Sequence, residues 1–255
     1  MAEQFGDVSL DVSDDFVASV ELHRPPNNFF DIDLIRALAD AYDGAERAGG
    51  RAILLCAEGK NFCAGVDFTR PAPSGGGAAA LYGEAARLLE HGLPVVAAVN
   101  GAAIGGGLGL ACSADFRVAA AETRFAANFA RLGFHHGFAL SVTLPAIVGQ
   151  QAALDLLYTG RRVAGDEAAR LGLCDRLVGA DAVRSTAHAL AAEIAASAPL
   201  AVRSIRATMR ADLVGRIRAA LAREAEEQDR LRQTRDWVEG VRAMAERRTP
   251  RFTGQ

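Results

Sequence analysis

The chain is poor in lysine: Lys60 is the only one among its 28 basic residues. A Schiff-base mechanism would have this single candidate nucleophile. The residues around it read Gly59-Lys60-Asn61, whereas a phosphate-binding loop has Ser or Thr after the lysine. Neither Schiff-base chemistry nor nucleotide binding of the P-loop type is therefore expected.

Cysteines are also few. The four of them lie far apart, mostly inside apolar runs, and lack the Cys or His spacing that closes a zinc tetrahedron. We therefore predict buried thiols and no metal site. The residues are Cys56, Cys63, Cys112 and Cys174.

Long apolar runs are absent as well. No stretch reaches the roughly 18 residues of a membrane span, and the residues up to Phe16 are acidic where a secretory signal is basic and then apolar. We expect a cytoplasmic protein with no membrane span. The net charge of -3 argues against a nucleic-acid partner, because such binding needs a basic surface. With 255 residues, 50% of them hydrophobic, the chain can bury a sizeable core, and a small-molecule ligand is favoured.

The first half of the chain alternates strand and helix patterns. Apolar and polar residues alternate over 7–23 with a break at an acidic turn, which predicts a hairpin. Helical spacing follows over 32–42. Two continuous apolar runs, 51–57 and 94–99, are typical of strands covered on both faces, and each leads into a glycine loop and then a helix. Residues 71–77 (PAPSGGG) are expected to form a surface loop.

Further along, a third strand is expected at 116–120. Helix dominates from about residue 166, with a long Arg- and Glu-rich helix over about 212–233. The pattern predicts an α/β core, residues 1–195, followed by a helical C-terminal region, residues 196–255.

The strand at 94–99 runs into five glycines between Gly101 and Gly109. A helix is predicted to start near Gly107, so free N–H groups and the positive end of the helix dipole face whatever lies in front. An oxygen that gains negative charge is favoured there; tight packing of helix on strand is the alternative use of these glycines. A second glycine loop, residues 58–68, follows the other buried strand. Each loop can supply one backbone N–H to a carbonyl that becomes charged in a transition state.

Five segments, in order, resemble the enoyl-CoA hydratase/isomerase family, also called the crotonase family. The resemblance implies an α/β fold with a spiral core of repeated ββα units and C-terminal helices that build a homotrimer or a dimer of trimers. It also implies an acyl-CoA thioester substrate, with coenzyme A as part of the substrate and no separate cofactor. The segments are 24–30 (RPPNNFF), 61–68 (NFCAGVDF), 94–115 (PVVAAVNGAAIGGGLGLACSAD), 159–178 (TGRRVAGDEAARLGLCDRLV) and 236–252 (DWVEGVRAMAERRTPRF).

Site residues follow from the resemblance by position. The backbone N–H groups of Val66 and Gly106 would form the family's oxyanion hole. Ala64, together with the backbone from Pro26 to Asn28, would lie near the adenine of coenzyme A.

Each charged residue near these positions has either a structural role or a role in binding substrate. Asp67 is either a helix cap or a group that contacts substrate. The family places basic groups around the coenzyme A phosphates, and each candidate here is otherwise a solvated charge. The candidates are Arg24, Lys60, Arg247, Arg248 and Arg251.

The family's usual catalytic carboxylates are absent. Its hydratases use two glutamates to move a water and a proton, and the matching residues here are Gly109 and Phe129. Relatives that act as dienoyl isomerases or dehalogenases place an aspartate at the position of Gly137. Standard hydration is thus in doubt. The apolar ring of Phe129 makes the predicted pocket drier, which suits enolate chemistry with one proton shuttle, such as double-bond migration or decarboxylation with reprotonation.

Two adjacent histidines are the best remaining acid-base groups, since imidazole titrates near neutrality. His136 is preferred over His135 because it lies next to the relatives' aspartate position; otherwise one packs in the core and the other faces a subunit interface. Tyr82 either donates a proton or is simply buried, at helical spacing from other core residues. Asn128 either orients a water or bonds to a buried carbonyl, and Phe129 would line the acyl pocket.

Three hypotheses remain open. The first is an acyl-CoA enzyme that forms a thioester enolate, by hydration or isomerisation of an enoyl-CoA or by decarboxylation with a histidine. The second is a catalytically silent member that binds acyl-CoA or stabilises an assembly. The third, RNA binding, is disfavoured by the single lysine and the mixed charge of residues 212–235.

Overall fold

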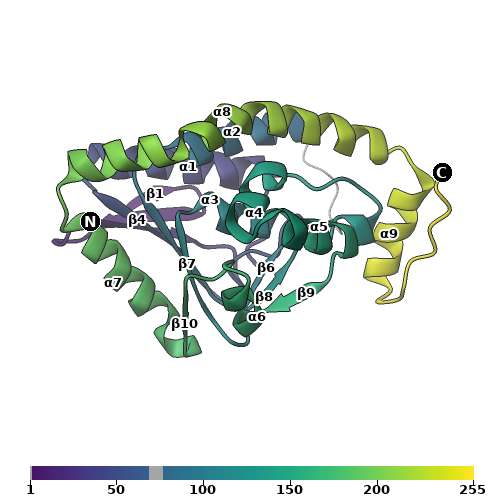
Figure 1. The fold of residues 1–255 in the computed structure, drawn as a ribbon, viewed down its shortest axis with the longest axis horizontal. Coiled ribbons are helices and arrows are strands. Elements are labelled where there is room, and N and C mark those ends of the chain that lie inside the picture. Colours follow the sequence, from purple (N-terminus) through teal and green to yellow (C-terminus); the bar gives the residue numbers. More distant parts are fainter. Residues whose placement is uncertain (1, 69–76) are drawn as a thin grey trace.

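The computed structural model describes residues 2–68 and 77–255, and a seven-stranded sheet forms its centre (Figure 1). The order across the sheet is β1-β2-β3-β4-β5-β7-β10. The first three strands pair antiparallel and the others parallel. The strands are β1 (Glu3–Phe5), β2 (Val8–Val12), β3 (Val17–Leu22), β4 (Ala52–Ala57), β5 (Val95–Val99), β7 (Phe116–Ala120) and β10 (Arg176–Val178).

The predicted hairpin is confirmed as β2 and β3, and the three predicted buried strands are confirmed as β4, β5 and β7. A second sheet has the order β6-β8-β9. Its strands are β6 (Ala102–Ile104), β8 (Arg124–Ala126) and β9 (Arg162–Ala164).

Helices cover both faces of the large sheet, because its central strands are apolar on both sides. In β4, Ile53 and Leu55 join the cluster beneath α1, α2 and α8, whereas Leu54 and Cys56 pack with α7 on the other face (Figure 1). The helices are α1 (Ile32–Arg47), α2 (Gly77–Glu90), α3 (Gly106–Ser113), α4 (Leu140–Val148), α5 (Gln150–Thr159), α6 (Gly165–Arg170), α7 (Val183–Ala195), α8 (Pro199–Leu231) and α9 (Arg235–Ala245), with single 3₁₀ turns at Ala130–Leu132 and Ala180–Ala182.

The long C-terminal helix, α8, begins well before the predicted residue 212. Its buried Ile217, Leu221 and Ala225 belong to the same hydrophobic cluster as the α/β core. The predicted boundary after residue 195 falls in the turn between α7 and α8, and the division into two domains stays a prediction. The predicted loop at 71–77 lies outside the described residues, except for Gly77, which begins α2.

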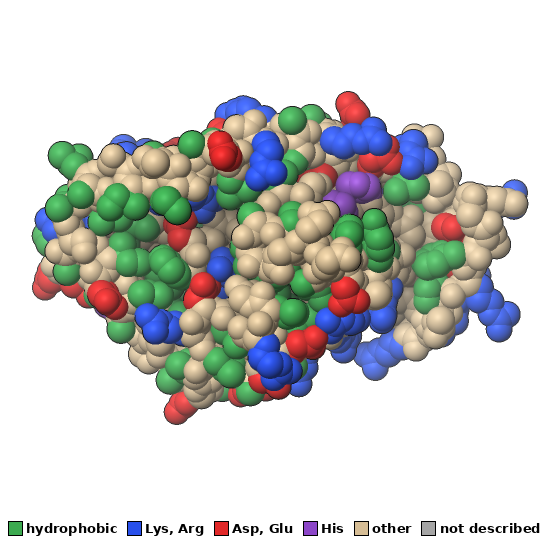
Figure 2. Space-filling view, viewed as in Figure 1, with side chains coloured by type: hydrophobic (Ala, Val, Ile, Leu, Met, Phe, Trp, Pro, Cys, Tyr) green, Lys and Arg blue, Asp and Glu red, His purple; other side chains and the backbone are tan. Residues whose placement is uncertain are grey.

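The first half of α8 exposes apolar side chains: Leu200, Ile205 and Met209 are 81%, 63% and 79% exposed. Figure 2 shows hydrophobic side chains at this end of the molecule, and interspersed acidic and basic side chains elsewhere on the same face. All four cysteines are buried and free, as predicted. No helix in the described ranges is both long and apolar enough to cross a membrane.

Candidate active site

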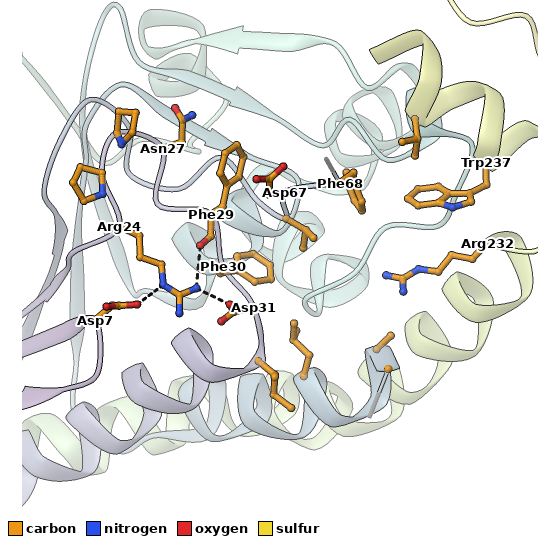
Figure 3. Close-up of a pocket in the computed structure, with 18 residues that line it drawn as sticks. Asp7, Arg24, Asn27, Phe29, Phe30, Asp31, Asp67, Phe68, Arg232 and Trp237 are labelled. Atoms are coloured by element: carbon orange, nitrogen blue, oxygen red, sulfur yellow. Dashed lines mark hydrogen bonds and ion pairs between the residues drawn. The ribbon is translucent and has the colours of Figure 1, made fainter. Parts of the chain in front are cut away.

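A cavity of about 1040 Å³ lies where several segments of the chain meet. Residues 24–32, between β3 and α1, form one wall, and residues 66–68 at the end of the second glycine loop form another. The start of α2, the end of α8 and α9 complete it (Figure 3). Arg24 and Asn27 make one end polar, while Trp237 and its neighbours make the other end largely apolar.

The two glycine loops lie side by side next to this cavity. Cys63 forms a parallel bridge with Ala103. Its N–H donates to the carbonyl oxygen of Ala102 (3.0 Å), and its own carbonyl accepts from the N–H of Ile104 (3.0 Å). Gly107 permits this approach, because a Cβ there would lie 2.1 Å from the carbonyl oxygen of Cys63.

The pairing places the turn at Gly65 against the first turn of α3. Gly65 has φ +83°, and a Cβ on it would lie 3.7 Å from the amide nitrogen of Gly106. Val66 lines the cavity and is 37% exposed. Gly106 is the first residue of α3, so its N–H has no partner inside the helix. Over residues 2–68 and 77–255, neither the Val66 nor the Gly106 N–H donates to a protein acceptor.

Phe30, in the wall formed by residues 24–32, contacts both Gly65 and Gly106. Its N–H donates to the carbonyl oxygen of Gly65 (2.9 Å). A Cβ on Gly106 would lie 2.3 Å from Cζ of Phe30. Glycine at position 106 is therefore needed for the Phe30 ring to occupy its place in the cavity wall.

Arg24 stands at the polar end of the cavity with its charge already paired. The guanidinium contacts Asp7 (Nε to Oδ2, 2.7 Å) and Asp31 (Nη1 to Oδ2, 2.8 Å). These two carboxylates more than neutralise the positive charge of Arg24. Through these pairs Arg24 joins the start of α1 to the β1–β2 turn, and its contact with a coenzyme A phosphate stays a prediction.

The other predicted coenzyme A contacts join the first wall to the second glycine loop. The side-chain amide of Asn28 is buried and donates to two carbonyls of that loop, those of Glu58 (2.8 Å) and Asn61 (2.7 Å). The N–H of Ala64 donates to the carbonyl oxygen of Asn27 (2.9 Å). Asn28 and Ala64 therefore hold the loops together, while neighbouring Pro26 lines the cavity.

The remaining charged candidates divide between the cavity and the surface. Asp67 lines the cavity and has an interaction of its own. Lys60 is exposed on the second glycine loop and is not among the described lining residues. Arg248 pairs with Glu239 and Glu246 near the C-terminus, where Arg247 and Arg251 are also exposed.

Two of the positions at which the resemblance places carboxylates in relatives have no room for an acidic side chain here. A Cβ on Gly109 would lie 2.5 Å from Cβ of Phe138, and a Cβ on Gly137 would lie 1.7 Å from the hydroxyl oxygen of Tyr82. Phe129 is buried in a cluster of aromatic rings. Glycine is required at 109 and 137 because Phe138 and Tyr82 fill the space that an acidic side chain would need.

We expect Gly109→Ala to lower the free energy of unfolding by about 1–3 kcal/mol, because the new methyl group overpacks against Phe138. Gly83→Ala is the matched control: Gly83 also lies in a helix, and nothing stands within 4 Å of its Cβ position. This control should be neutral or stabilising by up to about 1 kcal/mol. Urea unfolding measures both, and a Gly109→Ala protein as stable as the control would contradict the contact.

Phe134 and Phe129 lie between the cavity and His136, the histidine that the sequence favours as an acid-base group. From the lining residue Trp237, ring contacts run to Phe134 (4.4 Å), then to Phe129 (5.6 Å), then to His136 (6.5 Å between centroids). Neither His135 nor His136 is among the described residues that line the cavity. Proton transfer by His136 would therefore need Phe129 to turn aside.

The imidazole of His136 is held in place by Ser141 and His135. Its Nε2 lies 2.9 Å from Oγ of Ser141, and its ring stacks on His135 with centroids 4.1 Å apart. Burial, and to a smaller degree the neighbouring His135, lowers the pKa of His136 to about 3. The ring is thus neutral at physiological pH.

Tyr82 and Asn128 also lie off the described cavity lining. Tyr82 is 7% exposed on α2, with its hydroxyl beside Gly137 and the side-chain amide of Gln228. Burial raises its pKa, and the nearby carboxylate of Glu224 adds to the shift. The Oδ1 atom of Asn128 lies 3.2 Å from the Cβ position of Gly105, next to the start of α3.

Glu224 of α8 is a buried carboxylate that the sequence analysis missed. It accepts hydrogen bonds from the N–H of Ala139 (2.8 Å) and from both the N–H (2.9 Å) and the hydroxyl of Ser141. These bonds hold a strained turn, in which Phe138 and Ala139 have φ values of 60° and 59°. Burial raises the pKa of Glu224 to about 7, against the opposing effect of the Ser141 and Ala139 hydrogen bonds.

A signal for Glu224 was present in the sequence. One face of α8 carries residues at helical spacing: the buried Ile217 and Leu221, then Glu224 and Gln228. The same spacing continues to Arg232, the residue after the helix. Polar residues that continue an apolar stripe are placed in the interior. Within the described residues, no group of three or more His, Cys, Asp or Glu side chains is arranged to hold a metal ion.

The sheet order, the paired glycine loops and the C-terminal helices define a known class of protein. The family model for enoyl-CoA hydratase/isomerase matches residues 13–255, and the chain belongs to this family. The predicted α/β crotonase fold is confirmed by the crystal structure of an enoyl-CoA hydratase/isomerase from Pseudoalteromonas atlantica T6c. That structure is 30% identical, covers 97% of this chain and 100% of its own, and has a TM-score of 0.88.

Two curated relatives show the range within the family. A probable enoyl-CoA hydratase of Bacillus subtilis (strain 168) is 33% identical, over 97% of this chain and 99% of its own length. The 1,2-epoxyphenylacetyl-CoA isomerase of Escherichia coli (strain K12) is 29% identical, over 94% of this chain and 95% of its own.

Proposed function

We propose that this chain is an acyl-CoA enzyme that stabilises the enolate of a thioester with the backbone N–H groups of Val66 and Gly106. The observation that supports this most directly is that these two N–H groups lie on touching loops beside one cavity, without protein acceptors in the described ranges. A thioester oxygen that gains negative charge there would receive two hydrogen bonds and the favourable end of the α3 dipole.

The cavity suggests how the substrate would lie. The coenzyme A portion would follow residues 24–28 and Ala64, and the acyl group would extend toward Phe68 and Trp237. Because Arg24 is already paired with two carboxylates, exposed Lys60 is the better candidate for a phosphate contact. No cofactor beyond the coenzyme A of the substrate is required by this scheme.

The reaction we propose is hydration or isomerisation of an enoyl-CoA, in keeping with the relatives named hydratase and isomerase. It would run without the two usual glutamates, whose positions are Gly109 and Phe129. Decarboxylation, or other enolate chemistry with His136 as the proton shuttle, is the alternative within the same class.

A catalytically silent acyl-CoA-binding or assembly protein is the second candidate. The observation that favours it is the position of His135, His136 and Tyr82, all away from the described cavity lining. Exchange of α-protons in D₂O, followed by mass spectrometry over a panel of acyl-CoA thioesters, separates the candidates without knowledge of the final product. Exchange above the buffer rate supports the enzyme; binding of several thioesters with no exchange supports the silent protein.

The alternative with His136 as the proton shuttle predicts that His136→Ala lowers kcat by more than about tenfold with little change in coenzyme A affinity. His188→Ala, on α7, is the control and should leave both quantities unchanged. Turnover and coenzyme A binding are measured for each variant. A rate equal to that of the unmodified protein would exclude His136 as the shuttle.

We also propose that the protein forms a homotrimer or a dimer of trimers. The exposed Leu200, Ile205 and Met209 on α8 supply an apolar surface of the kind that subunits cover. Light scattering coupled to size-exclusion chromatography measures the mass of the assembly directly.

A further inference from the structure

The largely apolar end of the cavity contains an arginine that forms no ion pair with any described residue. Arg232, at the C-terminal end of α8, lines the cavity together with Phe68, Leu81, Trp237 and Val241. Figure 3 shows its guanidinium directed into the cavity, on the side opposite Arg24. In the part of the chain that the structure describes, this guanidinium makes no ion pair and no hydrogen bond, and its Nε is buried without an acceptor.

The two arginines of the cavity therefore differ. Arg24 is paired with two carboxylates, whereas the contact given for the Arg232 guanidinium within residues 2–68 and 77–255 is the ring of Trp237, 5.9 Å from its guanidinium carbon. A ring contact orients the cation but leaves its N–H groups unsatisfied. A buried donor without an acceptor is costly, so an acceptor that enters the cavity beside Arg232 is stabilised, and an anionic one most of all. Asp67, the acidic residue on the same side of the cavity, has an interaction of its own, and no ion pair joins it to Arg232 among the described residues.

The surroundings indicate which anion fits. The planar fork of a guanidinium matches a carboxylate with two parallel hydrogen bonds, and apolar walls strengthen such a pair by excluding water. If the thioester lies at Val66 and the coenzyme A portion follows residues 24–28, the group that reaches Arg232 belongs to the acyl part. We propose that the acyl group carries a second, free carboxylate that pairs with Arg232, so that the substrate is the monothioester of a dicarboxylic acid. This inference rests on the proposed function.

Binding of matched thioesters tests the proposal without requiring turnover. The probes are glutaryl-CoA and adipyl-CoA, each paired with the neutral acyl-CoA that has a methyl group in place of the free carboxylate, and free coenzyme A. The proteins are the unmodified chain, Arg232→Met, Arg232→Lys and, as a control, Arg216→Met, an exposed arginine of α8 outside the described cavity lining. Calorimetry gives each Kd.

We expect the unmodified chain to bind at least one carboxylated probe about tenfold or more tightly than its neutral partner. Arg232→Met should lose this preference and keep its affinity for the neutral thioesters, which also shows that it is folded. Arg232→Lys should keep part of the preference, because it retains the charge but not the fork. Arg216→Met should behave like the unmodified chain.

Three results would overturn the proposal. The first is equal affinity for both members of each pair in the unmodified chain. The second is a preference that survives Arg232→Met. The third is an equal loss of affinity for free coenzyme A and all thioesters in Arg232→Met, which would assign the arginine to a coenzyme A phosphate. Failure of every thioester and of coenzyme A to bind any of the proteins would instead refute the proposed function itself.

Discussion

A chain with proline at position 106 is expected to lose about 100-fold or more in enolate formation, because proline has no N–H to donate to the thioester oxygen. The backbone tolerates the change, since Gly106 is the first residue of α3 and proline is favoured at that position of a helix. The obstacle is steric: a Cβ on residue 106 would lie 2.3 Å from Cζ of Phe30. The experiment is therefore done in a Phe30→Ala background, which opens space for the added atoms.

The matched pair is Phe30→Ala/Gly106→Pro against Phe30→Ala/Gly106→Ala. Both double variants carry a Cβ at residue 106, and only the first lacks the N–H. Exchange of the thioester α-proton in D₂O is the measured quantity, with acyl-CoA binding and thermal unfolding as checks on folding. Equal exchange rates for the two variants would show that the Gly106 amide takes no part in stabilising the enolate.

Glu224 is expected to make the stability of the protein depend on pH in a particular direction. Its pKa is raised from 4.5 to about 7 in the folded chain, so the folded state holds this proton more tightly than the unfolded state does. The resulting stabilisation is fully present below about pH 4.5 and is lost as the pH rises through about 7. The size of the shift corresponds to about 3 kcal/mol.

Comparison with Glu224→Gln isolates this contribution, because glutamine has a similar shape and does not titrate. From pH 4.5 to 7, the free energy of unfolding of the unmodified chain should fall by about 3 kcal/mol relative to the variant. His136 acts in the opposite sense: its pKa is lowered to about 3, so its contribution to stability rises with pH up to about 6.5. That contribution is common to both proteins and cancels to first order in the difference. Parallel stability curves for the two proteins would contradict the raised pKa of Glu224.

The strands of the core were predictable because their signal is local. The apolar runs of β4 and β5 can only be buried on both faces, and the alternation across β2 and β3 has a period of two residues. Strands β1, β9 and β10 have three residues each, too few to show a period. The start of α8 escaped prediction because its first half exposes Leu200, Ile205 and Met209, and so lacks the core-facing stripe by which a helix is recognised.

The site was predictable only in part. Glycine composition and the family resemblance indicated the two loops, since a bare backbone is required where two chains meet at close range. The helical stripe that contains Ile217 and Leu221 indicates that Glu224 is buried. Its hydrogen bonds to Ala139 and Ser141, and the position of Arg232 at the cavity, depend on the packing partners of α8 and have no local signal. The sequence also shows that residues 109 and 137 are glycine, but that Phe138 and Tyr82 fill the adjacent space follows only from the fold.

The contacts of Gly109 and Gly137 impose an order on any mutational route that introduces an acidic side chain at either position. An acidic residue at 109 collides with Phe138, and one at 137 collides with Tyr82, so each gain of function must be preceded by a smaller residue at the obstructing position. Truncation of Phe138 or Tyr82 on its own opens a void in the interior and lowers stability. The intermediates on such a path are less stable than the present chain, so the substitutions depend on one another, and an acidic residue at either position requires at least one compensating change.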